Sequence, residues 1–237
     1  MSEKRTYGPS TARVMAAMGF AVLALAFSSI FIKKLELKNV PPLAIAFYRM
    51  ALATALLLPA AAALKRREIA RLGRSDAALL ALGGLFLAVH FGAWITSLKY
   101  ISIAASVVLV NSHPIFVVIA SYLFLNEKPS RRSLAGAAIG ITGMAIISRA
   151  GFRDVEFALL GNGLAVLGAL AVVGYFIIGR KVRARVSLLG YVTPLYAACS
   201  LFLLLWALAA GSALGPFDAG AWLYFAALAV IPTILGH

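Results

Sequence analysis

Residues 188–210 read LLGYVTPLYAACSLFLLLWALAA, an uninterrupted run without a charged side chain. A helix needs about 20 apolar residues to cross a hydrocarbon core of ~30 Å. Similar runs fill nearly all of the 237-residue chain, whereas a water-soluble domain would show polar helix faces or alternating strands. The sequence therefore predicts an all-α, polytopic membrane protein with eight spans, near residues 14–32, 43–64, 77–98, 102–124, 133–149, 157–179, 188–210 and 219–237.

The composition supports this class and argues against others. Hydrophobic residues make up 62% of the chain and its mean hydropathy is +0.95, against roughly 45–50% apolar residues in globular domains. The net charge of +14 comes from basic residues in the short gaps between apolar runs, so we expect membrane lipids and not nucleic acids as partners. The single cysteine, Cys199, lies within a run, and the sequence shows no metal-ligand cluster and no cofactor motif.

The gaps also predict the orientation of the chain. Summed over alternate gaps, Lys and Arg are far more frequent on the side of the N-terminal tail, residues 1–13, with the densest group in residues 65–74. Because positively charged loops stay in the cytoplasm, we expect a cytoplasmic N-terminus in a cell membrane of the bacterial inner-membrane type. The first apolar run is longer than the core of a signal peptide, so we interpret it as an uncleaved helix.

Two short matches indicate an internal repeat. Residues 29–34 (SIFIKK) resemble 174–181 (GYFIIGRK), and 87–90 (LAVH) resemble 234–237 (ILGH), at nearly the same separation. A unit of five spans is odd in number, so a second copy must be inverted in the membrane, as in many secondary transporters. We expect a ten-helix bundle of two inverted five-helix repeats: residues 14–149 form the first, and residues 157–237 form an incomplete second copy with three helices.

Several segments carry a family resemblance. They are residues 47–53 (FYRMALA), 90–102 (HFGAWITSLKYIS), 105–110 (ASVVLV), 113–116 (HPIF), 124–130 (FLNEKPS) and 231–237 (IPTILGH). With them the chain resembles the drug/metabolite transporter superfamily, EamA-domain type, along its whole length. One departure is His113, where relatives have a small residue before the proline. Relatives continue past the terminal Gly-His, which agrees with a C-terminally truncated chain.

The resemblance implies a secondary transporter with a central cavity and alternating access. Its substrate would be a small metabolite, amino-acid-like or amphipathic, moved by efflux or exchange, and no cofactor is implied. A non-transporting membrane subunit or assembly factor is the alternative. An intramembrane enzyme is a weaker one, because no Ser/His/Asp set can be assembled when every acidic residue falls in a gap or at a helix end. The same distribution disfavours a carboxylate proton relay, which leaves facilitated exchange or coupling through histidine.

The strongest site candidates lie on the third span. His90, Trp94 and Ser97 share one helical face, and a polar stripe in lipid must face protein or water. One interpretation places this face on the substrate cavity, with His90 binding or titrating. The other makes His90 a neutral packing residue bonded to a neighbouring helix, and the sequence leaves both open.

The fourth span offers Asn111, His113 and Pro114. A proline within a helix frees a backbone carbonyl and kinks the helix, which can place that carbonyl at a binding site. Asn111 and His113 point about 200° apart at 100° per residue, so we do not expect both in the cavity. A packing kink with satisfied polar groups is the equally weighted alternative.

Arg49 is the only cation well within a span. A charge there costs about 2.5–3.5 kcal/mol on insertion scales, so it requires a reason. We favour structural anchoring, with a side chain that snorkels outward, and keep binding of an anionic substrate as the alternative.

The remaining candidates are weaker. They are polar residues that we expect near the cavity or in bonds across helices: Ser28, Ser29, Tyr175, Tyr191, Thr193 and Tyr196. Glycines spaced as GxxxG in 136–143 fit internal packing or, less favoured, a homodimer interface. Glu127 and Lys128 are predicted to form a structural pair at the cytoplasmic end of the fourth span. No metal site and no catalytic residue are predicted.

Overall fold

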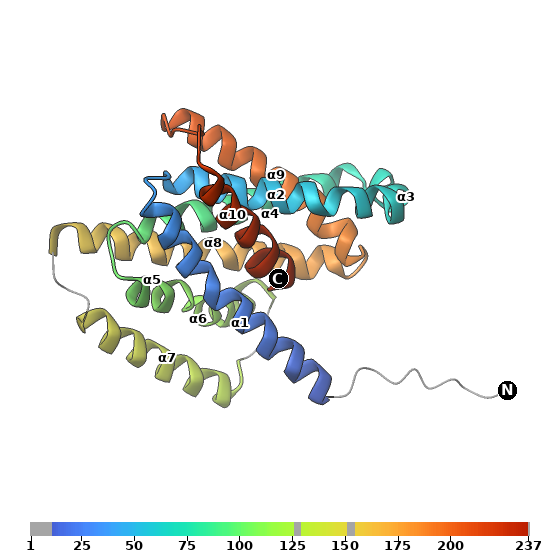
Figure 1. Ribbon diagram of the computed structural model, residues 1–237. Helices are drawn as coiled ribbons and strands as arrows, with labels where there is room; N and C mark the ends of the chain where they lie inside the picture. The colour runs from blue at the N-terminus through green and yellow to red at the C-terminus, as the bar shows by residue number, and fades with distance from the viewer. Residues whose placement is uncertain (1–10, 126–128, 151–154, 237) are drawn as a thin grey trace.

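A computed structural model describes residues 11–125, 129–150 and 155–236 (Figure 1). Within these residues, all regular secondary structure is helical. The elements are α1 (Thr11–Glu36), α2 (Pro42–Leu64), α3 (Arg66–Ala70), α4 (Arg74–Ser97), α5 (Ile103–Val110), α6 (His113–Leu125), α7 (Arg131–Ala150), α8 (Val155–Arg183), α9 (Leu188–Ala209), α10 (Ala219–Leu228) and the π-helix η1 (Ala229–Leu235).

Five of the described segments are long and apolar enough to cross a membrane. They are Pro42–Leu64, Arg74–Ser97, Ile103–Ala120, Phe157–Arg183 and Leu188–Ala209. The all-α, multi-pass membrane class is thereby confirmed, and five of the eight predicted spans coincide with these segments. The eighth prediction coincides with a shorter apolar helix, Ala219–Leu235, and α1 and α7 occupy the first and fifth predicted spans without belonging to the five.

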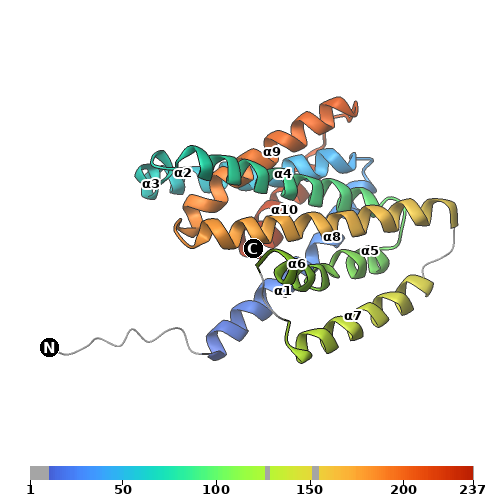
Figure 2. The ribbon, with the colours of Figure 1, turned by 180° about the vertical axis from the view of Figure 1, so that it is seen from behind.

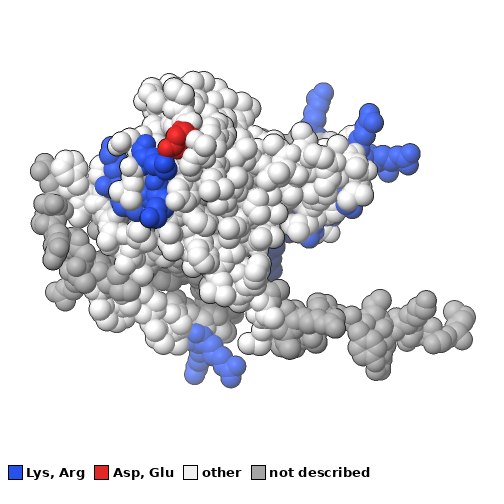
Figure 3. Space-filling model, viewed as in Figure 1, with Lys and Arg blue, Asp and Glu red and all other residues white. Residues whose placement is uncertain are grey.

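The surface of the bundle agrees with a lipid environment. Large apolar side chains are widely exposed, among them Leu23 at 65%, Ile139 at 74% and Leu159 at 78%. On the face in Figure 3, basic side chains gather at the left, at the right and at the lower edge, and most of the area between them is uncharged. Apolar area of this extent is unfavourable in water and neutral in hydrocarbon.

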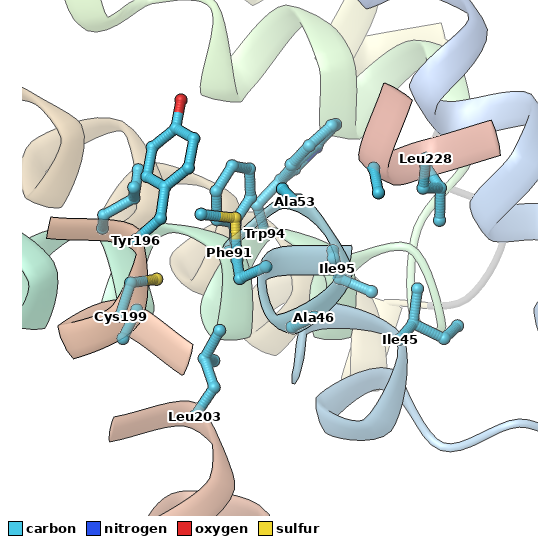
Figure 4. Close-up of a cluster of buried hydrophobic side chains, with 14 of the residues drawn as sticks. Ile45, Ala46, Ala53, Phe91, Trp94, Ile95, Tyr196, Cys199, Leu203 and Leu228 are labelled. Atoms are coloured by element: carbon cyan, nitrogen blue, oxygen red, sulfur yellow. The ribbon is translucent and has the colours of Figure 1, made fainter. Parts of the chain in front are cut away.

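Helices from the two halves of the chain interleave. α4 packs against both α8 and α9, α2 packs against α9, and α1 lies along α10 and η1 (Figures 1 and 2). Their shared core includes Phe91 and Trp94 of α4 beside Tyr196, Cys199 and Leu203 of α9 (Figure 4). The first three predicted spans therefore form their core with the sixth, seventh and eighth.

The contact between α4 and α9 depends on a residue without a side chain. A Cβ added at Gly84 would lie 2.7 Å from the Ala198 Cβ and 2.9 Å from both the backbone N of Cys199 and the backbone O of Leu195. Backbone atoms cannot move aside as a flexible side chain can. Gly84 thus sets how closely these two helices approach.

Helix starts follow the local sequence. Pro42 stands in the first turn of α2, where a backbone N–H would have no partner within the helix and the lack of one costs nothing. Ser102, Ser187 and Asp218 cap α5, α9 and α10, and each side-chain oxygen accepts a backbone N–H of the first turn.

The fourth predicted span differs from a single kinked helix. α5 ends at Val110 and α6 begins at His113, so the helix is interrupted at Asn111 and Ser112, and Pro114 sits in the first turn of α6. Proline fits that position because the first helical N–H groups have no partner within the helix. The predicted kink is therefore a break just before the proline.

Candidate functional site

Arg49 is the centre of the polar interior. Its side chain on α2 is 0% exposed. Nε donates to Thr233 Oγ1 of η1 at 2.7 Å, and Nη1 donates to Ser28 Oγ of α1 at 3.0 Å. The Thr233 hydroxyl donates its own proton to the Leu228 carbonyl at 2.8 Å, which leaves a lone pair for the guanidinium. The snorkelling route that the sequence suggested is wrong, because the side chain points into the bundle.

Aromatic side chains pack against another side of the Arg49 guanidinium. The Arg49 Cζ lies 4.2 Å from the centroid of the Phe91 ring, and Tyr196 and Cys199 of α9 also lie close to the cation. Figure 4 shows Phe91, Tyr196 and Cys199 gathered in this part of the core. A desolvated cation–π contact contributes about 2 kcal/mol, so Phe91 offsets part of the cost of burial.

Four carboxylates whose side chains the structure describes have other partners. Glu36 pairs with Lys33 at 2.8 Å, Asp76 with Arg185, and Asp218 with Lys38 at 2.6 Å, while Glu68 lies 3.3 Å from Lys65. In the described residues, Arg49 is therefore held by hydroxyls and a π face and not by an acidic residue. We call Arg49, Ser28, Thr233 and Phe91 the Arg49 centre.

His90 and Trp94 lie on α4 next to this centre. Their rings stack with centroids 5.9 Å apart, and the ring centroids of Trp94 and Phe91 are 6.4 Å apart. The Nδ1 of His90 lies 2.8 Å from the Gly168 carbonyl of α8; since a carbonyl only accepts, Nδ1 donates. This contact joins α4 to α8, as the packing interpretation of His90 predicts, and a role in transport remains a prediction.

We expect His90→Leu to lower the free energy of unfolding by about 0.6 kcal/mol, the average measured for bonds between membrane helices, and by no more than about 1.7 kcal/mol, the largest value measured. His90→Gln keeps an N–H donor, so its free energy of unfolding should fall by less. Chemical unfolding in lipid–detergent micelles measures both values. The pH profile of transport should be the same in wild type and both variants, and a titration step that disappears in both would assign His90 to the transport cycle.

Ser97 and Asn111, two other predicted polar residues, have their hydrogen-bond partners on α4 and α5. Ser97 Oγ lies 2.7 Å from Ser106 Oγ and also donates to the Trp94 carbonyl at 2.7 Å. Asn111 is exposed and donates to the Val107 carbonyl of its own helix. The contact of Ser97 with Ser106 joins α4 to α5.

The carbonyl freed by Pro114 has a partner. In a continuous helix, the backbone N–H of residue 114 would donate to the Val110 carbonyl, but proline has no N–H. The Nδ1 of His113 lies 3.2 Å from that carbonyl instead. The His113 ring also packs 5.5 Å from Phe176 of α8. His113 thus gives the Val110 carbonyl the hydrogen-bond partner that Pro114 cannot supply.

Tyr175 and Tyr191 form a separate aromatic pair. They lie on α8 and α9 with ring centroids 6.4 Å apart, and both are buried. Ser29 is also buried on α1, yet its neighbour Ser28 is the residue that contacts Arg49. The structure therefore does not gather all predicted candidates at one point.

Polar contacts bridge the two halves at what we call the α3 end. Glu68 Oε1 of α3 accepts the Ser187 N–H, before α9, at 2.5 Å, and Asp76 of α4 pairs with Arg185 of the same connection. The Ser187 N–H holds the pKa of the Glu68 carboxyl below its usual value. Glu68 is therefore ionised, and able to make this contact, throughout the neutral range.

A second set of contacts bridges the opposite, α10 end. Lys38 Nζ lies 2.6 Å from Asp218 Oδ2, and Tyr48 donates its hydroxyl to the Leu214 carbonyl at 2.6 Å. The Lys38 ammonium holds the pKa of Asp218 below its usual value. Residues before and within α2 are thus tied to the connection between α9 and α10.

Two further predictions concern the pair Glu127–Lys128 and the glycines of α7. Glu127 and Lys128 lie outside the described residues. On α7, a Cβ at Gly140 would lie 3.8 Å from Ile115 Cδ1, an ordinary contact, and one at Gly136 or Gly143 would meet nothing within 4 Å, so the described structure shows no close helix approach at these glycines; the homodimer stays a prediction. Among the described residues, no group of three or more His, Cys, Asp or Glu could hold a metal ion.

Sequence reasoning missed two members of the centre, Phe91 and Thr233, and offered Ser28 only as a weaker candidate beside Ser29. Phe91 reads as one more core aromatic, and Ser28 is indistinguishable from Ser29 without coordinates. Thr233 carried a signal, since it is a hydroxyl beside Pro232 in an apolar run.

Comparisons with known proteins agree with one another. The sequence model of the EamA-like transporter family matches residues 13–149, more than half of the chain. An uncharacterized transporter of Archaeoglobus fulgidus is 28% identical over 203 residues, which cover 83% of this chain and 67% of that protein. A protein of known crystal structure superposes with a TM-score of 0.66 at 21% identity, covering 94% of this chain and 76% of that chain, and thus shares its fold.

Proposed function

Since this chain belongs to the EamA-like transporter family, we propose that it is a secondary transporter that moves a small metabolite, amino-acid-like or amphipathic, by alternating access. This is a transporter family and not an enzyme family. The observation that carries the proposal is the Arg49 centre: a fully buried cation among apolar helices from both halves of the chain. Intramembrane charges of this kind mark substrate or ion pathways.

The helix contacts support two inverted repeats. In that arrangement α1 corresponds to α8, α2 to α9, and α4 to α10 with η1. A two-fold axis in the membrane plane then converts the contact of α4 with α8 into that of α10 and η1 with α1, and the contact of α4 with α9 into that of α10 and η1 with α2. The protein has all of these contacts, and the pair of α2 and α9 maps onto itself. We therefore propose a ten-helix architecture for the family fold, to which residues 14–149 and 157–237 contribute.

The two sets of end contacts support alternating access. The α3 end and the α10 end each join elements of the first half to connections in the second half. Breaking one set while keeping the other would open the Arg49 centre to one side of the membrane. The positive residues of 65–74 and 180–185 favour a cytoplasmic α3 end, which would place the N-terminus in the cytoplasm of a bacterial-type cell.

Counterflow in proteoliposomes tests the proposal. The purified full chain is reconstituted, vesicles are loaded with one unlabelled compound of an amino-acid and amphipathic-metabolite panel, and uptake of the same labelled compound is followed. We expect at least one compound to enter loaded vesicles faster than empty ones. The carrier that takes unlabelled compound outward returns its binding site to the outer face, where it can take up labelled compound. Equal flux in loaded, empty and protein-free vesicles over the whole panel would contradict the proposal.

A further inference from the structure

We propose that the Arg49 centre binds a carboxylate of the transported solute, so that the substrates are organic acids or zwitterions whose carboxylate faces the guanidinium. This inference rests on the proposed function and adds the substrate class. It begins from the charge of the centre, which the described protein groups leave uncompensated.

Burial makes this charge expensive. Arg49 is 0% exposed, and an isolated charge in a low-dielectric interior is stabilised only by a counter-charge or by dense hydrogen bonding. Its hydrogen-bond partners here are two neutral hydroxyls, and the described acidic side chains are engaged with Lys33, Lys65, Arg185 and Lys38. A solute carboxylate would supply the missing negative charge.

The free donor is placed for bidentate binding. Nε is used by Thr233 and Nη1 by Ser28, whereas the buried Nη2 has no hydrogen-bond partner. A guanidinium binds a carboxylate in parallel either through Nε and Nη2 or through Nη1 and Nη2, and Nη2 belongs to both forks. Entry of a carboxylate therefore displaces only one hydroxyl and satisfies the unpaired donor.

The hydroxyl on η1 is the better candidate for displacement. Thr233 stands in a π-helical segment next to Pro232, and short π-helices are frequent at functional sites. Its proton is held by the Leu228 carbonyl, so the hydroxyl remains bonded when Arg49 turns to a solute. The Phe91 face on the guanidinium favours a flat, delocalised cation there, which lysine does not provide.

The test compares acids with their amides on the purified full chain in nanodiscs. L-leucine, L-phenylalanine and 4-methylpentanoate are matched to L-leucinamide, L-phenylalaninamide and 4-methylpentanamide, and thermal unfolding is followed over a concentration series. We expect half-saturating concentrations at least about tenfold lower for the acids, as for a charged hydrogen-bonded pair. The wild-type contrast needs no variant, so a misfolded mutant cannot obscure it.

Variants and an inorganic anion complete the test. Arg49→Met should abolish the preference for acids and Arg49→Lys should reduce it, while Arg71→Met removes an exposed arginine and should leave it intact. The inference would be overturned if the amides bind as well as the acids, or if no acid stabilises the protein. It would also be overturned if the preference for acids persists in Arg49→Met, or if chloride, titrated against isethionate, reproduces the whole effect. If counterflow succeeds only with compounds lacking a carboxylate, this inference fails and the proposed function stands; if no compound is exchanged, the proposed function itself fails.

Discussion

Gly84→Ala is expected to lower the free energy of unfolding by about 1–3 kcal/mol, the usual cost of overpacking a well-packed core. The added methyl would lie 2.9 Å from two backbone atoms of α9, so the helices α4 and α9 must separate along the contact that holds the halves together. Unfolding of the purified protein in lipid–detergent micelles measures the change.

Gly163→Ala on α8 is the matched control. The same methyl there would meet no atom within 4 Å, so the variant should be as stable as wild type or gain up to about 1 kcal/mol from alanine's helix propensity. Equal stabilities of the two variants would show that α4 and α9 do not approach as described.

Removing the contacts at the α3 end is expected to expose the Arg49 centre from that side. In the double variant Glu68→Ala with Asp76→Ala, two bridges to the connection between α8 and α9 are lost. Each is comparable to an ordinary hydrogen bond, so their joint loss should shift the equilibrium toward the open state by about tenfold or more. Cys199 is the readout, because it is the chain's single cysteine and lies buried beside Arg49.

The rate at which a membrane-impermeant maleimide reacts with Cys199 measures this shift. Vesicles of defined orientation should show faster reaction from the α3 side in the double variant, and from the α10 side in Lys38→Ala with Tyr48→Phe. Glu36→Ala removes an ion pair within α1 and should change neither rate. Acceleration from both sides at once in either double variant would indicate general loosening and contradict a gate at each end.

The sequence was sufficient for the fold class and for many helix ends. Long apolar runs, Pro42 at the start of α2 and the capping residues Ser102 and Ser187 are local signals that neighbouring residues decide. The break at Asn111 and Ser112 was only half predictable, since proline disfavours the helix before it but does not specify where the helix resumes.

The candidate site was less accessible to sequence reasoning. That Arg49 needs a partner follows from its position in an apolar run, but the partners Ser28 and Thr233 lie on other elements of the bundle. The choice of Ser28 over Ser29 depends on the rotation of α1, which its nearly uniform apolar sequence does not specify. His90 was correctly singled out as polar and buried, and only the packing of α4 on α8 revealed its bond to Gly168.

The central claim is that one buried centre, shared by both halves of the chain, is reached alternately from the two sides of the membrane. Modification of wild-type Cys199 in right-side-out and inside-out vesicles tests it most directly. We predict slow reaction from both sides, and protection from both sides by any compound that shows counterflow. Reaction from one side only, unchanged by the α3-end and α10-end variants, would contradict the account.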